Sequence, residues 1–226
     1  MSRKKIKNPL IKRIPKEIIG DWKKYLVVFL FLVLTIGFVS GMYVANDSML
    51  TSADEGVSKY KQEDGHFELK DKADSELVTA IESGEVKTAI DEKDSDSSKI
   101  PVTLYENFYR NETEDYDADG KKDGTIRVYT KTEDINLACL IEGSFPQNET
   151  EIAVDRMHAD NVGMKVGDTI KVSGKEFKVS GLIAYVNYST LHEKKTDMMF
   201  DAIKFDVAMV TKDGFDRLDK SIHYTY

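Results

Sequence analysis

The sequence has 226 residues, of which 41% are hydrophobic and 32% are charged, and its formal net charge is −8. This length is sufficient for a domain of ordinary size with its own core. The acidic balance argues against nucleic acid as a ligand, and the single cysteine, Cys139, excludes a disulfide bond within the chain.

Residues 25–44 are the most apolar part of the chain and carry no charged side chain. A helix of this length, at about 1.5 Å per residue, matches the roughly 30 Å hydrocarbon core of a bilayer. We therefore predict a transmembrane helix from Tyr25 to Val44. A cleaved signal peptide is the alternative, because Val39, Ser40 and Gly41 resemble a cleavage site, but the apolar run exceeds the roughly 7–15 residues of a signal sequence.

The charges on the two sides of this apolar run are opposite. Residues 1–24 contain nine Lys and Arg side chains against two acidic ones, whereas the remaining chain contains 23 basic and 38 acidic side chains. The positive-inside rule then places the amino terminus in the cytoplasm and the main domain outside the cell membrane.

Residues 1–24 also have a helical pattern of apolar side chains. Ile14, Ile18 and Trp22 recur at spacings of four residues, with lysine and arginine between them. This pattern predicts an amphipathic helix on the inner leaflet, with these three side chains as its anchors in the membrane lipid. A basic flank without further structure is the alternative, and Pro15 counts against one continuous helix.

Small residues lie on one side of the apolar run, where Gly37, Ser40 and Gly41 form a G-x-x-x-G pattern with a neighbouring serine. Small side chains allow another helix backbone to approach closely. We predict that this face packs against another membrane helix, either further helices of a permease or a second permease subunit.

The helical pattern continues after Val44, since Ala45, Met49, Ala53 and Val57 follow at steps of four residues. We expect a helical stalk over residues 45–62. Such a stalk either transmits a movement from the membrane or serves as a simple spacer, and the sequence does not distinguish the two.

Residues 63–226 are predicted to form a mixed α+β domain with a small β-rich subdomain. The expected strands are 65–69, 86–90, 102–105, 126–129, 152–154, 169–172 and 177–180, and the last two are joined by a hairpin turn at 173–175. The expected helices are 75–83, with Leu77, Val78 and Ile81 facing inward, and 155–161. The polar run 91–98 is expected to be a loop.

Several short motifs along the chain occur in an order that resembles a known family. They are Thr35–Met42, Glu63–Phe67, Glu142–Pro146, Glu151–Asp155, Gly163–Ile170 and Phe177–Leu182. Together they resemble the FtsX-like or MacB-like permease subunits of ABC transporters, namely the first membrane helix and the extracytoplasmic core domain. Because such permeases usually have three further membrane helices, the resemblance implies that residues 63–226 are an incomplete core domain at their carboxyl end.

This resemblance implies a mechanical function. In such permeases a separate cytoplasmic ATPase drives movement of the outer domain, and this chain has no G-x-x-x-x-G-K-[ST] motif of its own, so ATP would act only through that partner. The alternative is a single-pass, membrane-anchored extracellular binding module.

No catalytic motif is apparent in the sequence. His66, His158, His192 and His223 have no metal-ligand spacing, and Cys139 lies among apolar residues and is expected to be buried. We therefore expect no enzyme activity and no resident cofactor.

One loop has the composition of a calcium site. Asp115, Asp117 and Asp119 alternate before Gly120, as in the first half of an EF-hand loop, and Asp123 follows. Ile126 occupies the place of the closing glutamate, and Lys121 and Lys122 reduce the negative charge. The sequence therefore favours a solvated loop with weak calcium binding at most.

Overall fold

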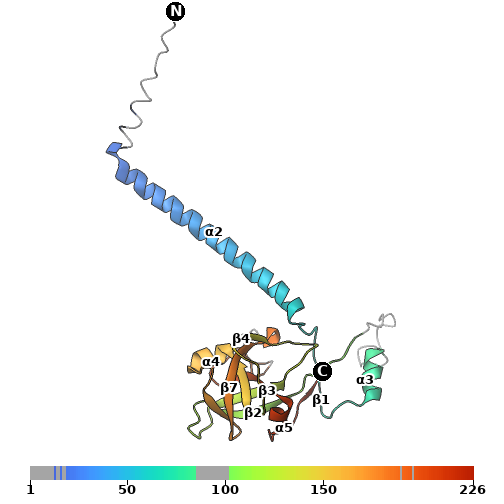
Figure 1. Ribbon diagram of the computed structural model, residues 1–226. Coiled ribbons are helices and arrows are strands. Elements are labelled where there is room, and N and C mark those ends of the chain that lie inside the picture. Colours follow the sequence, from blue (N-terminus) through green and yellow to red (C-terminus); the bar gives the residue numbers. More distant parts are fainter. Residues whose placement is uncertain (1–12, 14–15, 17–18, 85–101, 189, 195) are drawn as a thin grey trace, which may run out of the picture. The chain divides into compact units, whose positions relative to one another are not determined.

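The computed structural model describes residues 13, 16, 19–84, 102–188, 190–194 and 196–226. The chain forms two compact units, residues 1–55 and 56–226. The helix α2 (Trp22–Lys59) runs for 38 residues without interruption, and all but its last four residues belong to the first unit (Figure 1). Its best 18-residue window has a mean hydropathy of 2.4, and no other helix in the described part of the chain is long and apolar enough to span a membrane.

The second unit is a mixed α and β domain. Its helices are α3 (Ser75–Glu82), α4 (Arg156–Val162) and α5 (Lys212–Asp216), with a 3₁₀ turn η1 (Val186–Tyr188). Its strands are β1 (Glu68–Leu69), β2 (Tyr109–Asp115), β3 (Gly124–Thr130), β4 (Cys139–Gly143), β5 (Glu151–Asp155), β6 (Thr169–Val172), β7 (Lys175–Ala184), β8 (Phe205–Val210) and β9 (Tyr224–Thr225).

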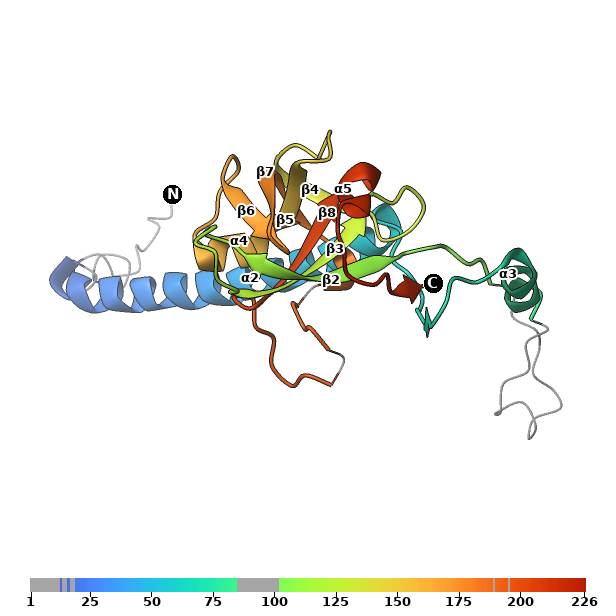
Figure 2. The same cartoon turned by 90° about the horizontal axis from the view of Figure 1, so that it is seen from below.

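Seven strands form one curled sheet in the order β4-β7-β5-β8-β3-β2-β6, and a further pairing of β6 with β7 closes it like a barrel (Figure 2). The ten residues of β7 make this closure possible, because Lys175–Lys178 pair with β6 while Lys178–Ile183 pair with β5. β4 joins β7 outside the closed ring, and β1 and β9 form a separate two-stranded pair.

The two faces of the barrel strands support two apolar clusters. In β8, Ala208 and Val210 belong to the cluster inside the ring, whereas Val207 and Met209 belong to the cluster on the outer face. This alternation follows from the two-residue period of a strand. Since all six residues of β8 are buried, this strand lies between the two clusters.

Local signals in the sequence correctly predict several elements. The carboxylate of Asp155 caps α4 by accepting hydrogen bonds from the backbone N–H of Met157 and His158. Asp74 likewise caps α3. The β6–β7 hairpin turns at Ser173 and Gly174, whose φ angles are 47° and 79°.

Other expectations are wrong. Residues 102–105 do not form a strand, and the strand expected over 65–69 contains only β1. Leu77 is exposed, contrary to the prediction, whereas Val78 and Ile81 are half-buried, and α3 has no fully buried residue. β6 and β7 belong to the main sheet and not to a separate subdomain. The strand expected over 86–90 and the loop 91–98 lie outside the described residues.

Candidate functional site

The membrane-related residues lie in or before α2. Gly37, Ser40 and Gly41 are exposed on this helix, and a Cβ built on either glycine would meet no atom within 4 Å. Trp22 is the first residue of α2 and is 54% exposed. Ile14 and Ile18 lie outside the described residues. The expected packing and anchoring roles therefore remain predictions.

The segment that directly follows α2 is bound to the loop between β3 and β4. The backbone N–H groups of Asn136 and Leu137 donate to the carbonyls of Lys61 and Tyr60 at 2.9 and 2.8 Å. The Asn136 side chain accepts from the backbone N–H of Glu63 at 3.1 Å and donates to its carboxylate. Asn136 is only 2% exposed. We call residues 60–63 together with 133–139 the junction.

The junction also contains the single cysteine. The Tyr60 hydroxyl lies 2.9 Å from Cys139 Sγ and donates a hydrogen bond to it. Cys139 is partly exposed at the start of β4, so the prediction of a buried cysteine is wrong. The hydrogen bond from Tyr60 gives this cysteine a structural role in the junction.

A polar pocket of about 560 Å³ begins beside the junction. Its walls come from the segment after α2, from β2 and β3, from residues 187–188, 190 and 192–194, and from residues 225–226. The lining residues are Glu63, His66, Glu68, Asn107, Tyr109, Asn111, Arg127, Tyr129, Asn187, Tyr188, Thr190, His192, Glu193, Lys194, Thr225 and Tyr226.

Arg127 is the central cation of this pocket. Its guanidinium donates to Asn111 Oδ1 at 2.9 Å, to the Tyr188 hydroxyl at 3.0 Å and to the Glu193 carbonyl at 3.0 Å. It also lies 4.5 Å from the ring centroid of Tyr109. These three acceptors are neutral, and the described residues give Arg127 no carboxylate partner. Arg127 therefore has no direct carboxylate counter-ion among the described residues, although the pocket lining also contains Glu63, Glu68 and Glu193.

Three polar atoms at the pocket are buried without a hydrogen-bond partner in the described part of the chain. They are Asn187 Oδ1, His192 Nδ1 and Thr225 Oγ1. The free energy cost of such atoms falls when a ligand or a water molecule binds them. This arrangement is typical of a binding pocket.

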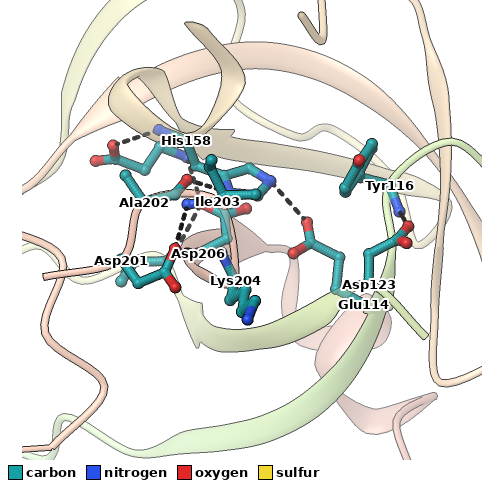
Figure 3. A network of polar contacts seen from close by, with 11 residues as sticks. Glu114, Tyr116, Asp123, His158, Asp201, Ala202, Ile203, Lys204 and Asp206 are labelled. Atoms are coloured by element: carbon teal, nitrogen blue, oxygen red, sulfur yellow. Dashed lines mark hydrogen bonds and ion pairs between the residues drawn. The ribbon is translucent and has the colours of Figure 1, made fainter. Parts of the chain in front are cut away.

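A second group of polar residues lies inside the barrel. Glu112 of β2 and Asp206 of β8 both pair with Ile126 of β3, which lies between them. Figure 3 shows His158, from α4, between Glu114 and Ala202. Its Nε2 lies 3.2 Å from Glu114 Oε1, and its Nδ1 donates to the Ala202 carbonyl at 2.9 Å.

These groups hold His158 in its charged form. Burial alone lowers the pKa of His158, but the charge of Asp206, the contact with Glu114 and the Ala202 carbonyl outweigh burial and raise it to about 9. Both ring nitrogens then carry protons and act as donors. Burial raises the pKa of Asp206 well above its ordinary value. The group therefore acts as a structural charge cluster.

Sequence spacing gave no indication of the pocket or of the charge cluster. His158 and Glu114 are 44 positions apart, and Arg127 and Tyr188 are 61 apart, so only the closed sheet brings them together.

Of the predicted metal ligands, Asp115, Asp117 and Asp123 have oxygens within 4.8 Å of one another. Asp119 is not part of this group, and its carboxylate pairs with Lys121.

The fold and the pocket together define a small barrel-like domain that follows a helix apolar enough to span a membrane. Compared with models of known protein families and with curated proteins, the chain matches none.

Proposed function

We propose that this chain is a permease subunit of an ABC transporter of the FtsX-like or MacB-like kind. In this function residues 25–44 cross the cell membrane with the amino terminus in the cytoplasm, and a cytoplasmic ATPase drives movement of the outer domain. The apolar helix α2 and the opposite charges on its two sides support this proposal.

The junction is the observation on which the mechanical part of the proposal depends. A passive tether needs only a flexible linker, whereas the segment after α2 is bound through backbone and side-chain hydrogen bonds to the loop before β4. Asn136, which makes the central contacts, is buried and has a φ angle of 47°. A displacement of the end of α2 would therefore act directly on β4 and on its partner β7.

The test labels the junction in the full chain, purified from membranes together with any ABC ATPase that binds it. A single cysteine is placed at Asp64 in a Cys139→Ser background and carries an environment-sensitive fluorophore. We expect the fluorescence to differ between the ATP-bound and ADP-bound complexes. The same label at Lys165, an exposed position remote in sequence from the junction, should not respond.

A substitution at Asn136 tests whether the junction transmits movement in a domain that still folds. Asn136→Gly removes the side-chain hydrogen bonds but accepts the positive φ angle, so the domain should fold while the response at position 64 falls. Asn148→Gly, in an exposed loop, is the matched control and should leave the response unchanged. Absence of an ABC ATPase from the purified complex, or identical fluorescence in both nucleotide states, would contradict the proposal.

The pocket favours a second function, a membrane-anchored extracellular binding module. In that case Arg127 binds the anionic group of a small molecule, and Tyr109 and Tyr188 provide aromatic contacts beside it. Calorimetry on the full chain with small carboxylates tests this function. Binding that is weakened by Tyr188→Phe and is independent of any ATPase would favour the binding module over the permease.

A further inference from the structure

The loop between β2 and β3 gathers three carboxylates. Asp115 is the last residue of β2, and Asp123 directly precedes β3. With Asp117 they place one oxygen each within 4.8 Å of one another. The loop is held in this form by hydrogen bonds from the backbone N–H of Gly120 to Asp115 Oδ2 and of Tyr116 to Asp123 Oδ2, at 2.9 and 3.1 Å.

Asp115 has an oxygen without a partner. The residue is only 7% exposed, and its Oδ1 is buried and accepts no hydrogen bond from the described part of the chain. A buried carboxylate oxygen without hydrogen bonds costs free energy, and a bound cation removes that cost. The position of this side chain within the group of three carboxylates therefore points to a ligand.

The neighbouring lysines make their direct contacts with other atoms of the loop. Lys121 Nζ lies 2.5 Å from Asp119 Oδ2. Lys171 Nζ donates to the carbonyl of Ala118 at 2.8 Å. The charge of Lys121 also acts on Asp117 and Asp123, but neither ammonium group directly contacts Asp115, Asp117 or Asp123.

We propose that Asp115, Asp117 and Asp123 bind a calcium ion. Three carboxylates supply hard oxygen ligands, and backbone carbonyls and water complete the six to eight oxygens that Ca²⁺ prefers. Their spacing corresponds to positions 1, 3 and 9 of an EF-hand loop, with Gly120 at position 6, where its φ angle of +93° makes the sharp turn.

The missing ligand at position 12 of the loop determines its affinity for calcium. Position 12 of the loop is Ile126, which is fully buried in the barrel core and provides no oxygen. Without the bidentate glutamate, we expect a Kd for calcium of about 10⁻⁴–10⁻³ M, which is typical of extracellular calcium modules. This site does not depend on the proposed permease function.

Terbium luminescence provides the experiment. The full chain in detergent micelles, freed of metal with a chelator, is titrated with Tb³⁺, which replaces Ca²⁺ and is excited through a nearby tyrosine such as Tyr116. We expect a saturable signal that Ca²⁺ displaces. Mg²⁺ should not displace Tb³⁺ at the same concentration, because it requires near-ideal octahedral geometry.

Variants then locate the site. Asp117→Asn and Asp123→Asn should each weaken the displacement by Ca²⁺ at least about tenfold. Asp160→Asn, an exposed aspartate on α4 that pairs with Arg156, should bind like the unmodified chain. Equal affinity in all variants, displacement by Mg²⁺ as effective as by Ca²⁺, or the absence of a saturable signal would overturn the proposal. Calorimetry with Ca²⁺ alone checks that the result does not come from the probe.

Discussion

His158 Nε2 lies 3.2 Å from Glu114 Oε1, and neither side chain has any solvent exposure. This ion pair connects α4 to β2 inside the barrel (Figure 3). Asp206 adds a second carboxyl group whose charge acts on the same imidazole. The domain therefore contains a buried charge cluster where most small barrels contain apolar side chains.

We predict that the domain loses stability in mildly alkaline solution. The folded protein raises the pKa of His158 from 6.5 to about 9, so its contribution is fully present below pH 6.5 and is lost as the pH rises through about 9. The free energy of unfolding should fall by on the order of 3 kcal/mol between these two pH values.

Urea denaturation of the full chain, followed by the near-ultraviolet circular dichroism of its tyrosines, measures this effect at several pH values. His158→Gln is the control, and its stability should vary much less over the same interval. A free energy of unfolding that rises from neutral to mildly alkaline pH would be incompatible with a charged His158.

A second prediction concerns the buried ion pair between Glu114 and His158. Glu114→Gln removes the carboxylate and leaves a buried imidazolium with less compensation, which should reduce the free energy of unfolding by about 3–5 kcal/mol. The exposed pair of Arg156 and Asp160, 2.7 Å apart, is the comparison. Asp160→Asn should cost less than about 1 kcal/mol, since exposed ion pairs contribute little. Similar losses in the two variants would refute a special role of the buried pair.

A third prediction tests the contact between β4 and β7. A Cβ added at Gly181 would lie 2.5 Å from the carbonyl oxygen of Ser144 and 2.9 Å from that of Glu142. Both atoms belong to the backbone, so Gly181→Ala must displace a strand and should reduce the free energy of unfolding by about 1–3 kcal/mol. Gly65→Ala, where no atom lies within 4 Å, should have little effect. Thermal unfolding of both variants decides whether this close approach is required.

A fourth prediction concerns the small-residue face of α2. Gly37→Leu combined with Gly41→Leu should prevent close helix packing while keeping the helix apolar enough to insert. Cross-linking to a partner helix should therefore fall without loss of membrane insertion. Val39→Leu, which lies on the opposite side of the helix, serves as the control. Unchanged cross-linking in the double variant would show that the two glycines are incidental.

Some features of this protein follow from the sequence alone because their causes are local. Twenty uncharged residues predict the apolar part of α2 through composition. Asp155 starts α4 by capping its first N–H groups, and Ser173 with Gly174 turns the β6–β7 hairpin, since both effects act within a few residues. The alternating aspartates before Gly120 likewise marked the loop in which the structure brings Asp115 and Asp117 together with Asp123.

Other features depend on pairings between distant segments. The sequence of β2, YRNETED, contains few apolar residues and resembles an exposed loop, yet Glu112 and Glu114 are fully buried because β2 closes the barrel against β6. The junction requires Asn136 to meet residues 61–63, and the pocket requires Arg127 to meet Tyr188. Strand register and ring closure are long-range properties, and local residue preferences do not encode them. Only the tertiary structure could therefore decide which polar side chains are buried together.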